Sequence, residues 1–280
     1  MVVEAIESVV RQSFDDLEVI VADDGSTDGT AERIAALGGP IRYLYLPHSG
    51  FRLGQVRNRA LREARGDLIA FLDDDDQWEP EKLARQVALL DSDAEVGLVY
   101  TGFSVLTDDG SVHVPELARW QTGRGPLLDR LLRECFIHPS TAVVRRTLLE
   151  RVNGLDERRS PCEDYDLWLR LAPLTIGACI AEPLVRLRRG VTSNSVRDRP
   201  ERQVEIYDTS IAILEDWLAS GRLRARQGLR CRAAISNLHA AAAEDAHETG
   251  DGRRARRHAR GALLRNPLSR RAWAAVRRSP

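Results

Sequence analysis

Four consecutive carboxylates, at residues 73–76, are the residues whose types and spacing most clearly suggest chemistry. They follow the apolar run 68–72, which predicts a buried strand. Neighbouring carboxylates repel one another, and a divalent cation such as Mg²⁺ or Mn²⁺ relieves that repulsion through oxygen ligands. Ligands of open α/β sheets bind beyond the carboxyl ends of the strands, so the run is suitably placed. The alternative is an acidic turn that caps a helix beginning at Pro80, and the run alone leaves both interpretations open.

Two further acidic segments occur elsewhere in the chain. Residues 23–29 follow a predicted strand and are rich in turn-forming and capping side chains. Glu163 and Asp164 begin a predicted helix over 163–171. Each segment could simply cap its own helix. Right-handed crossovers would nevertheless place loops 23–29 and 73–78 at the same edge of the sheet, which favours a shared crevice.

Helices alternate with strands in the first part of the chain, which predicts parallel pairing and a layered α/β sheet. The predicted helices are 2–12, 30–36, 54–64 and 80–90, and the predicted strands are 17–22, 41–46, 68–72 and 96–106. A short helix at 127–135 and strands at 140–146, 174–180 and 184–187 are expected next. Only helices are predicted beyond residue 200. We therefore expect a domain at 1–195 and a helical C-terminal extension at 196–280.

The composition is that of a globular protein with a real core, since 43% of its 280 residues are hydrophobic. The net charge of -1 gives no reason to expect nucleic acid. No apolar run is long enough to span a membrane, and no basic-then-apolar leader is present. The four cysteines lack metal-type spacing and, in a chain of this length, do not suggest a disulfide framework, so a reducing cytosol is the default expectation.

The C-terminal stretch 251–280 is strongly basic, with ten arginines and one acidic residue. Basic amphipathic helices can lie on anionic membranes, although a solvated helical face is the commoner outcome. The expected localisation is therefore cytoplasmic, with peripheral contact at the inner face of the plasma membrane through the C-terminal helices left open.

Four motifs together resemble those of the family 2 glycosyltransferases, which have the nucleotide-sugar-binding GT-A fold. The motifs are residues 23–29, Arg57-Asn58, residues 71–76 and residues 163–168. Each motif is weak alone, but their order and spacing match the family over about residues 1–190. The resemblance implies a GT-A-type mixed, mostly parallel sheet flanked by helices.

The resemblance also implies an inverting, metal-dependent transfer of sugar from a nucleoside diphosphate sugar to the hydroxyl of a saccharide or lipid-linked acceptor. A Mg²⁺ or Mn²⁺ ion would stabilise charge on the leaving diphosphate, and a base would take the acceptor's proton. The residue roles that it implies are nucleotide binding by Asp23, Asp24, Arg57 and Asp73, metal binding by Asp75 and Asp73, and catalysis by Asp164 beside Glu163.

One departure from the family pattern qualifies these expectations. Family members begin with an apolar strand that precedes the helix expected here at 2–12, and this sequence has no counterpart. A start codon placed too far downstream, a true fragment, or a rearranged and inactive domain would each explain the difference. A non-catalytic nucleotide-sugar-binding protein is therefore the alternative function. A haloacid-dehalogenase-like phosphatase is disfavoured because Gln77 replaces its usual Thr or Val, and Lys82 lies too close to the acidic run.

Overall fold

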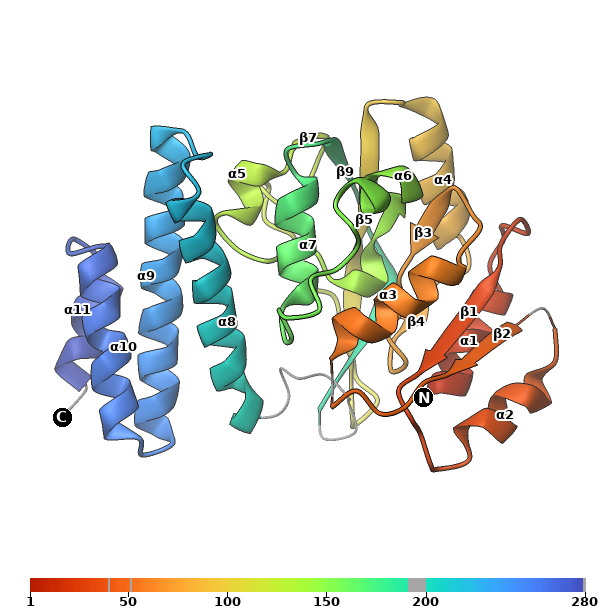
Figure 1. Cartoon of the computed structure of the whole chain (residues 1–280), viewed down its shortest axis with the longest axis horizontal. Helices are drawn as coiled ribbons and strands as arrows, with labels where there is room; N and C mark the ends of the chain where they lie inside the picture. Colours follow the sequence, from red (N-terminus) through yellow and green to blue (C-terminus); the bar gives the residue numbers. More distant parts are fainter. Residues whose placement is uncertain (40, 51, 191–199, 279–280) are drawn as a thin grey trace. The chain divides into compact units, whose positions relative to one another are not determined.

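The computed structural model describes residues 1–39, 41–50, 52–190 and 200–278 (Figure 1). The chain divides into two compact units, Met1–Leu127 with Phe136–Asp198, and Leu128–Cys135 with Arg199–Pro280. The domain boundary predicted between residues 195 and 196 lies outside the described residues.

The first unit begins with two helix–strand pairs that form a small parallel sheet. Its elements are α1 (Val2–Val10), β1 (Val19–Asp23), α2 (Thr30–Leu37) and β2 (Ile41–Tyr45). The register runs from Val19 opposite Ile41 to Asp23 opposite Tyr45. The carboxyl ends of both strands therefore lie together, and the loops that follow them are neighbours (Figure 1).

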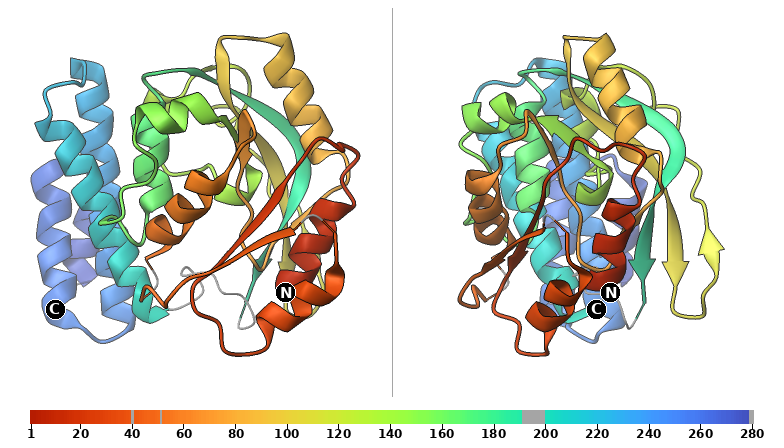
Figure 2. Two further views of the ribbon diagram at one scale, coloured as in Figure 1. Left: turned by 45° about the vertical axis from the view of Figure 1, so that its right-hand side comes forward. Right: turned by 90° about the vertical axis from the view of Figure 1, so that its right-hand side faces the viewer.

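The remaining described strands form a seven-stranded sheet with the order β3-β8-β5-β9-β4, to which β6 and β7 are attached. Its strands are β3 (Leu68–Ala70), β4 (Gln77–Trp78), β5 (Val96–Thr107), β6 (Val112–His113), β7 (Gly125–Pro126), β8 (Val143–Arg145) and β9 (Ile176–Arg189). The two long strands β5 and β9 run parallel and side by side (Figure 2). The mixed α/β architecture predicted from the sequence is thus confirmed.

Several details of the sheet differ from the sequence-based prediction. The alternation of helices and strands predicted that β3 would pair in parallel with its neighbours, but β3 pairs antiparallel with β8. The strands predicted at 174–180 and 184–187 are one strand, β9, whose pairing with β5 shifts register near Gly102. The prediction failed here because pairing depends on long-range contacts rather than on local periodicity.

The core of the first unit surrounds the central strand β5. Val96, Leu98 and Val99 are fully buried, because helices and loops cover both faces of the sheet. Helix α4 (Lys82–Ser92) packs against β5 and contributes Leu90 to the same cluster. A Cβ atom on Gly177 of β9 would lie 2.3 Å from the Leu127 side chain, so only glycine fits this contact.

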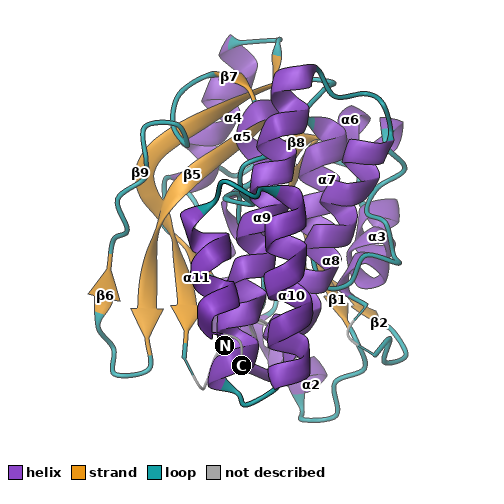
Figure 3. Cartoon of the chain, turned by 90° about the vertical axis from the view of Figure 1, so that its left-hand side faces the viewer, coloured by secondary structure: helices purple, strands orange, loops and turns teal. Residues whose placement is uncertain are grey.

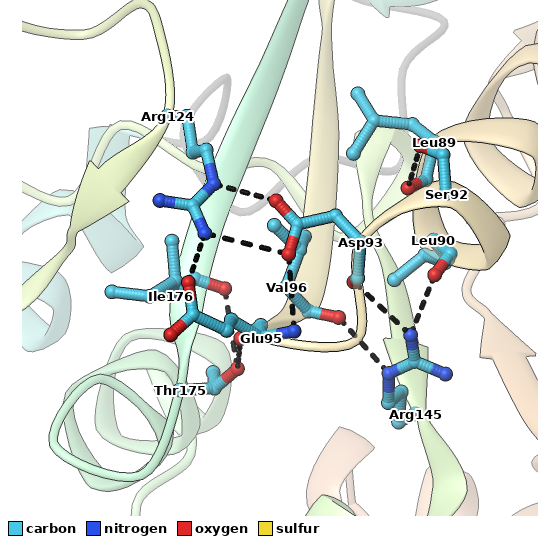
Figure 4. Close-up of polar contacts among 10 residues, drawn as sticks. All are labelled: Leu89, Leu90, Ser92, Asp93, Glu95, Val96, Arg124, Arg145, Thr175 and Ile176. Atoms are coloured by element: carbon cyan, nitrogen blue, oxygen red, sulfur yellow. Dashed lines mark hydrogen bonds and ion pairs between the residues drawn. The ribbon is translucent and has the colours of Figure 1, made fainter.

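The turn between α4 and β5 is held by two arginines (Figure 4). Arg145 of β8 donates to the carbonyl oxygens of Leu90 at 2.7 Å and Val96 at 2.9 Å. It thereby satisfies a carbonyl that the end of α4 leaves without an intrahelical partner. Arg124 forms ion pairs with Asp93 and Glu95 on the opposite side of the turn. These contacts join the beginning of β5 to β8 and fix the sheet from which the acidic loop emerges.

Further helices complete the first unit, and the described part of the second unit is built of helices. In the first unit these are α3 (Leu53–Glu63), the 3-10 helix η1 (Pro139–Thr141), α6 (Arg146–Arg151) and α7 (Glu163–Leu171). The second unit contains α5 (Leu128–Leu131), α8 (Pro200–Ala219), α9 (Ala225–Glu248), α10 (Gly252–Arg265) and α11 (Arg270–Arg278). None of the described helices has both the length and the apolar composition that a membrane span requires.

The second unit has an unusual core made largely of alanine. Helices α9, α10 and α11 bury a cluster of six alanines, namely Ala240, Ala243, Ala259, Ala262, Ala272 and Ala275. Small side chains allow these helices to approach closely, and Figure 3 shows α10 and α11 lying side by side. The helical character predicted for the C-terminal region is confirmed.

Candidate active site

Arg57 of α3 joins two of the acidic segments that the sequence singled out. Its Nη2 lies 2.6 Å from Asp73 Oδ1, and its Nη1 lies 2.5 Å from Glu163 Oε1. The Arg57 side chain is only 16% exposed, so solvent screens these ion pairs weakly. One guanidinium therefore connects the carboxyl end of β3 to the N-terminus of α7.

Helix α3 is itself anchored to the segment that leads into α7. The Asn58 side chain accepts a hydrogen bond from the backbone N–H of Leu155 and donates one to its carbonyl oxygen, each at 2.9 Å. Gly154 has a φ of 67° and approaches Asn58 so closely that an added Cβ would lie 2.5 Å from its Oδ1. Adjacent helical residues point about 100° apart, so Arg57 reaches the carboxylates while Asn58 binds the backbone. In this pair, Arg57 forms ion pairs with the carboxylates, and Asn58 holds α3 against the segment before α7.

Helix α7 presents its first two acidic residues in different environments. The Glu163 side chain is 4% exposed, and its Oε2 is buried without a hydrogen-bond partner among the described residues. Burial raises the pKa of Glu163 to about 7, although Arg57 opposes this effect and Asp164 reinforces it. Asp164 is partly exposed and so is open to solutes. Trp168 anchors the helix by donating to the carbonyl oxygen of Ile137 at 3.0 Å.

The acidic loop after β3 is held in place by Ser140 of η1. Ser140 Oγ donates to Asp76 Oδ2 at 2.6 Å and accepts from the backbone N–H of Asp73 at 3.1 Å. Asp76 also accepts from the backbone N–H of Arg188 at 3.1 Å. Burial, followed by the charges of Asp73 and Asp75, raises the pKa of Asp76 well above its usual value. Asp76 therefore has a structural role in shaping the loop.

The oxygen donors at this loop fit a hard divalent cation. Asp73 is 37% exposed, whereas Asp75 is buried. The described residues contain no group of three or more His, Cys, Asp or Glu side chains placed to hold a metal. Mg²⁺ characteristically uses one or two carboxylates and completes its shell with substrate phosphates and water. The chemistry of Asp73 and Asp75 thus matches a cation that is held jointly with a diphosphate.

Asp23 and Asp24 belong to a second cluster beside β2. Asp23 accepts from the Ser26 backbone N–H at 2.8 Å and from the Tyr43 hydroxyl. Burial raises the pKa of Asp23, but these hydrogen bonds outweigh it and lower that pKa overall. Burial, together with the hydrogen bond to Asp23, raises the pKa of Tyr43 to about 12. Asp24 accepts from the backbone N–H of Ser49 at 2.6 Å and from its hydroxyl at 2.9 Å. Both carboxylates thus accept hydrogen bonds that order the two loops after β1 and β2.

The structure therefore distributes the predicted site residues over two clusters. One cluster contains Arg57, Asp73, Asp75, Glu163 and Asp164, linked through ion pairs and mutual electrostatic effects. The other contains Asp23 and Asp24, which are held by residues of their own loop, β2 and the loop after β2.

Two residues that organise the acidic loop were not predicted from the sequence. Ser140 supports Asp73 and Asp76, and Arg188 Nε donates to the Asp75 carbonyl oxygen at 3.3 Å. Nothing in the local pattern distinguishes Ser140 from other serines, and Arg188 lies in an arginine-rich stretch. Both form hydrogen bonds to residues more than 60 positions away in the sequence, so only the folded chain identifies them.

Comparisons with known proteins agree with this architecture. The chain is 34% identical over 177 residues to the putative teichuronic acid biosynthesis glycosyltransferase TuaG of Bacillus subtilis, covering 60% of this chain and 65% of TuaG. The matched segment spans 65% of one curated relative from Rickettsia prowazekii and only 25% of another from Rickettsia bellii.

Solved structures show the same fold at lower sequence identity. The crystal structure of S. aureus TarS matches with a TM-score of 0.71 and 19% identity, over 98% of this chain and 48% of TarS. TarS 1-349 in complex with UDP-GlcNAc matches with a TM-score of 0.65 and 20% identity, over 98% of this chain and 84% of that chain. The mannosyltransferase PcManGT from Pyrobaculum calidifontis, in complex with GDP-Man and Mn²⁺, matches with a TM-score of 0.58 and 20% identity, over 99% of this chain and 79% of that chain.

A family model also covers more than half of the chain and includes the acidic loop, Arg57, and the elements β3 and α3 that carry them. The model described as Glycosyl transferase family 2 matches residues 1–152. The protein belongs to glycosyl transferase family 2.

Proposed function

We propose that this glycosyltransferase transfers a sugar from a nucleoside diphosphate sugar to an acceptor hydroxyl with inversion, and that it depends on a divalent cation. The observation that carries the proposal is the double ion pair of Arg57 with Asp73 and Glu163. This pair brings the donor-side acidic loop and the start of α7 to one site. A single displacement requires such an arrangement, with the leaving group on one side and a base on the other.

Asp164 is the base in this proposal, and Glu163 is its positioning neighbour. Asp164 is partly exposed and can reach an acceptor hydroxyl, whereas the Glu163 carboxylate is buried against Arg57. The N-terminus of α7 stabilises the ionised form of an acidic side chain in its first turn. A carboxylate there can accept the hydroxyl proton as the new glycosidic bond forms.

Asp73 and Asp75 would hold the cation, which would neutralise charge on the departing diphosphate. Ser140 and Arg188 keep the loop in shape by binding the backbone of Asp73 and Asp75. Asp23 and Asp24 are proposed to bind the nucleoside.

The donor class is supported by relatives rather than by a bound ligand. TarS has been solved with UDP-GlcNAc and PcManGT with GDP-Man, so a nucleoside diphosphate sugar is the shared chemistry. The name of TuaG refers to the biosynthesis of teichuronic acid, a polysaccharide, which supports a saccharide or lipid-linked saccharide as the acceptor.

An Asp164→Asn variant tests the assignment of the base. We expect transfer to fall by at least 100-fold, the lower range for the loss of general-base catalysis. Nucleotide binding in the presence of Mn²⁺, measured by calorimetry, should remain within about twofold, because Asp164 is not a nucleotide ligand in the proposal. Asp67→Asn is the matched control, since it removes the same charge from a fully exposed side chain.

Two outcomes would count against this assignment. Normal transfer by Asp164→Asn would show that another group takes the proton. Wild-type protein that binds nucleotide sugars but neither transfers nor hydrolyses them would favour a non-catalytic binding protein.

A further inference from the structure

Three of the exposed large apolar side chains in the second unit lie close together in α10, α11 and the connection between them. Leu264 at the end of α10 is 83% exposed, Leu268 in the α10–α11 connection is 90% exposed, and Trp273 of α11 is 47% exposed. The alanine cluster already fills the space between α9, α10 and α11, so these side chains contribute little to the core. Exposed Leu and Trp side chains gathered within ten residues indicate a surface that binds something.

Unpaired arginines lie on the same helical stripes as these apolar residues. On α10, Arg253, Arg260 and Leu264 are spaced by seven and four residues, so they share one stripe. On α11, Arg270, Trp273 and Arg277 are spaced by three and four residues and likewise share one stripe. We call these two stripes, together with Leu268, the basic apolar surface.

Some arginines outside the two stripes are paired with acidic side chains. Arg265 pairs with Glu215 of α8, and Arg271 pairs with Glu244 of α9. Arg253, Arg260, Arg270 and Arg277 are exposed, and none forms an ion pair with a residue that the structure describes. The alanines of α10 and α11 pack in the cluster that they share with α9, and helical spacing puts both stripes on the side away from those alanines. The second unit thus concentrates uncompensated positive charge beside exposed apolar groups.

We infer that the basic apolar surface docks the protein on an anionic lipid bilayer. Phosphate headgroups would receive the arginines, and the two leucines would enter the boundary between headgroups and acyl chains. Tryptophan favours this boundary because its ring is amphipathic. A nucleic acid would account for the arginines, but not for leucines that are exposed by more than 80%. This inference does not depend on the proposed transfer reaction.

Vesicle co-sedimentation of the full chain tests the inference directly. We expect binding to phosphatidylcholine vesicles that contain phosphatidylglycerol, weak binding to phosphatidylcholine alone, and loss of binding as salt increases. The double variant Arg270→Gln/Arg277→Gln should lower the partition coefficient about 25-fold, at about fivefold per charge. Leu264→Ser/Leu268→Ser should lower it by about tenfold or more, since two leucine side chains lose their insertion.

A matched control separates this surface from the general charge of the protein. Arg222→Gln/Arg226→Gln removes two exposed arginines at the α8–α9 turn, and Leu229→Ser removes another exposed leucine. We expect these variants to bind within about twofold of the wild type. Thermal unfolding verifies that each variant is folded.

Three results would overturn the inference. The first is a wild-type protein that does not bind phosphatidylglycerol vesicles at low salt. The second is equal loss of binding in the surface and control variants. The third is tighter binding to a DNA or RNA oligonucleotide than to the vesicles, which would identify a different polyanion as the partner.

Discussion

Replacing Arg57 by Met should destabilise the protein to an extent that depends on pH, because the buried Glu163 would lose its cation. The pKa of Glu163 is about 7 in the folded protein, compared with 4.5 for a glutamate free of the fold. The folded wild type therefore binds a proton at Glu163 more tightly than the unfolded chain does. Stability in the wild type therefore falls as pH rises from about 4.5 to about 7 and is then constant with respect to this group. Without Arg57, the pKa of Glu163 rises further and the decline continues above pH 7.

The magnitude follows from this linkage. At about pH 5, Glu163 is protonated in both proteins, so the variant loses little more than the partly exposed contact with Asp73, or about 1 kcal/mol. Above pH 7 the difference grows by about 1.4 kcal/mol per pH unit, which gives about 2–3 kcal/mol at pH 8. This value lies below the ~3–5 kcal/mol for breaking a buried pair, because the remaining carboxyl can take up a proton.

Urea unfolding followed by circular dichroism at several pH values measures this difference, provided that the denaturant slope stays constant. Arg57→Met/Glu163→Gln is the control, because it removes the titrating group and should show no added pH dependence above pH 7. A destabilisation by Arg57→Met that is the same at about pH 6 and about pH 8 would refute the reasoning.

Three further predictions concern the acidic loop and the second unit. Asp75→Ala should weaken Mn²⁺-dependent nucleotide binding by at least tenfold in calorimetry, and chelation with EDTA should reduce the wild type to a similar level. Ser140→Ala should lower the free energy of unfolding, measured with urea, by about 1–3 kcal/mol, because Asp73 and Asp76 lose a hydrogen-bond partner. Ser140→Thr keeps a hydroxyl and should be less destabilising than Ser140→Ala. Burial lowers the pKa of His258 to about 4, so the folded state resists protonation of this side chain more than the unfolded chain does. The free energy of unfolding should therefore fall by about 3 kcal/mol as pH falls from about 6.5 towards 4. His258→Leu should therefore make thermal unfolding less sensitive to acid, and an unchanged acid sensitivity would contradict this.

Ser140 and Arg188 illustrate why a loop of four carboxylates can stay ordered. Asp76 is buried and hydrogen-bonded on both oxygens, whereas Asp73 is partly exposed and paired with Arg57. One carboxylate thus maintains the loop, while Asp73 keeps part of its surface exposed. Adjacent residues of the same type have different roles because the neighbouring strand and η1 contact them differently.

The sequence alone predicted several helices, the family and the basic character of the C-terminal region. Periodicity predicted α3, α7 and the helical C-terminal region, because amphipathic spacing reports which face of a helix is buried. The order of the four motifs identified the family before any contact was known. Proteins that share one fold and one reaction carry their functional residues in the same order along the sequence. The basic character of the last two helices was likewise evident from composition.

Only the tertiary structure decided how these parts meet. The antiparallel pairing of β3 with β8 and the continuity of β9 depend on hydrogen bonds between distant segments, which local propensity does not encode. The division of Glu163 and Asp164 into a buried and a reachable carboxylate required the position of Arg57, 106 residues earlier in the chain. Burial and charge pairing are properties of the folded surroundings, and for that reason the residue types are visible in the sequence but their electrostatic states are not.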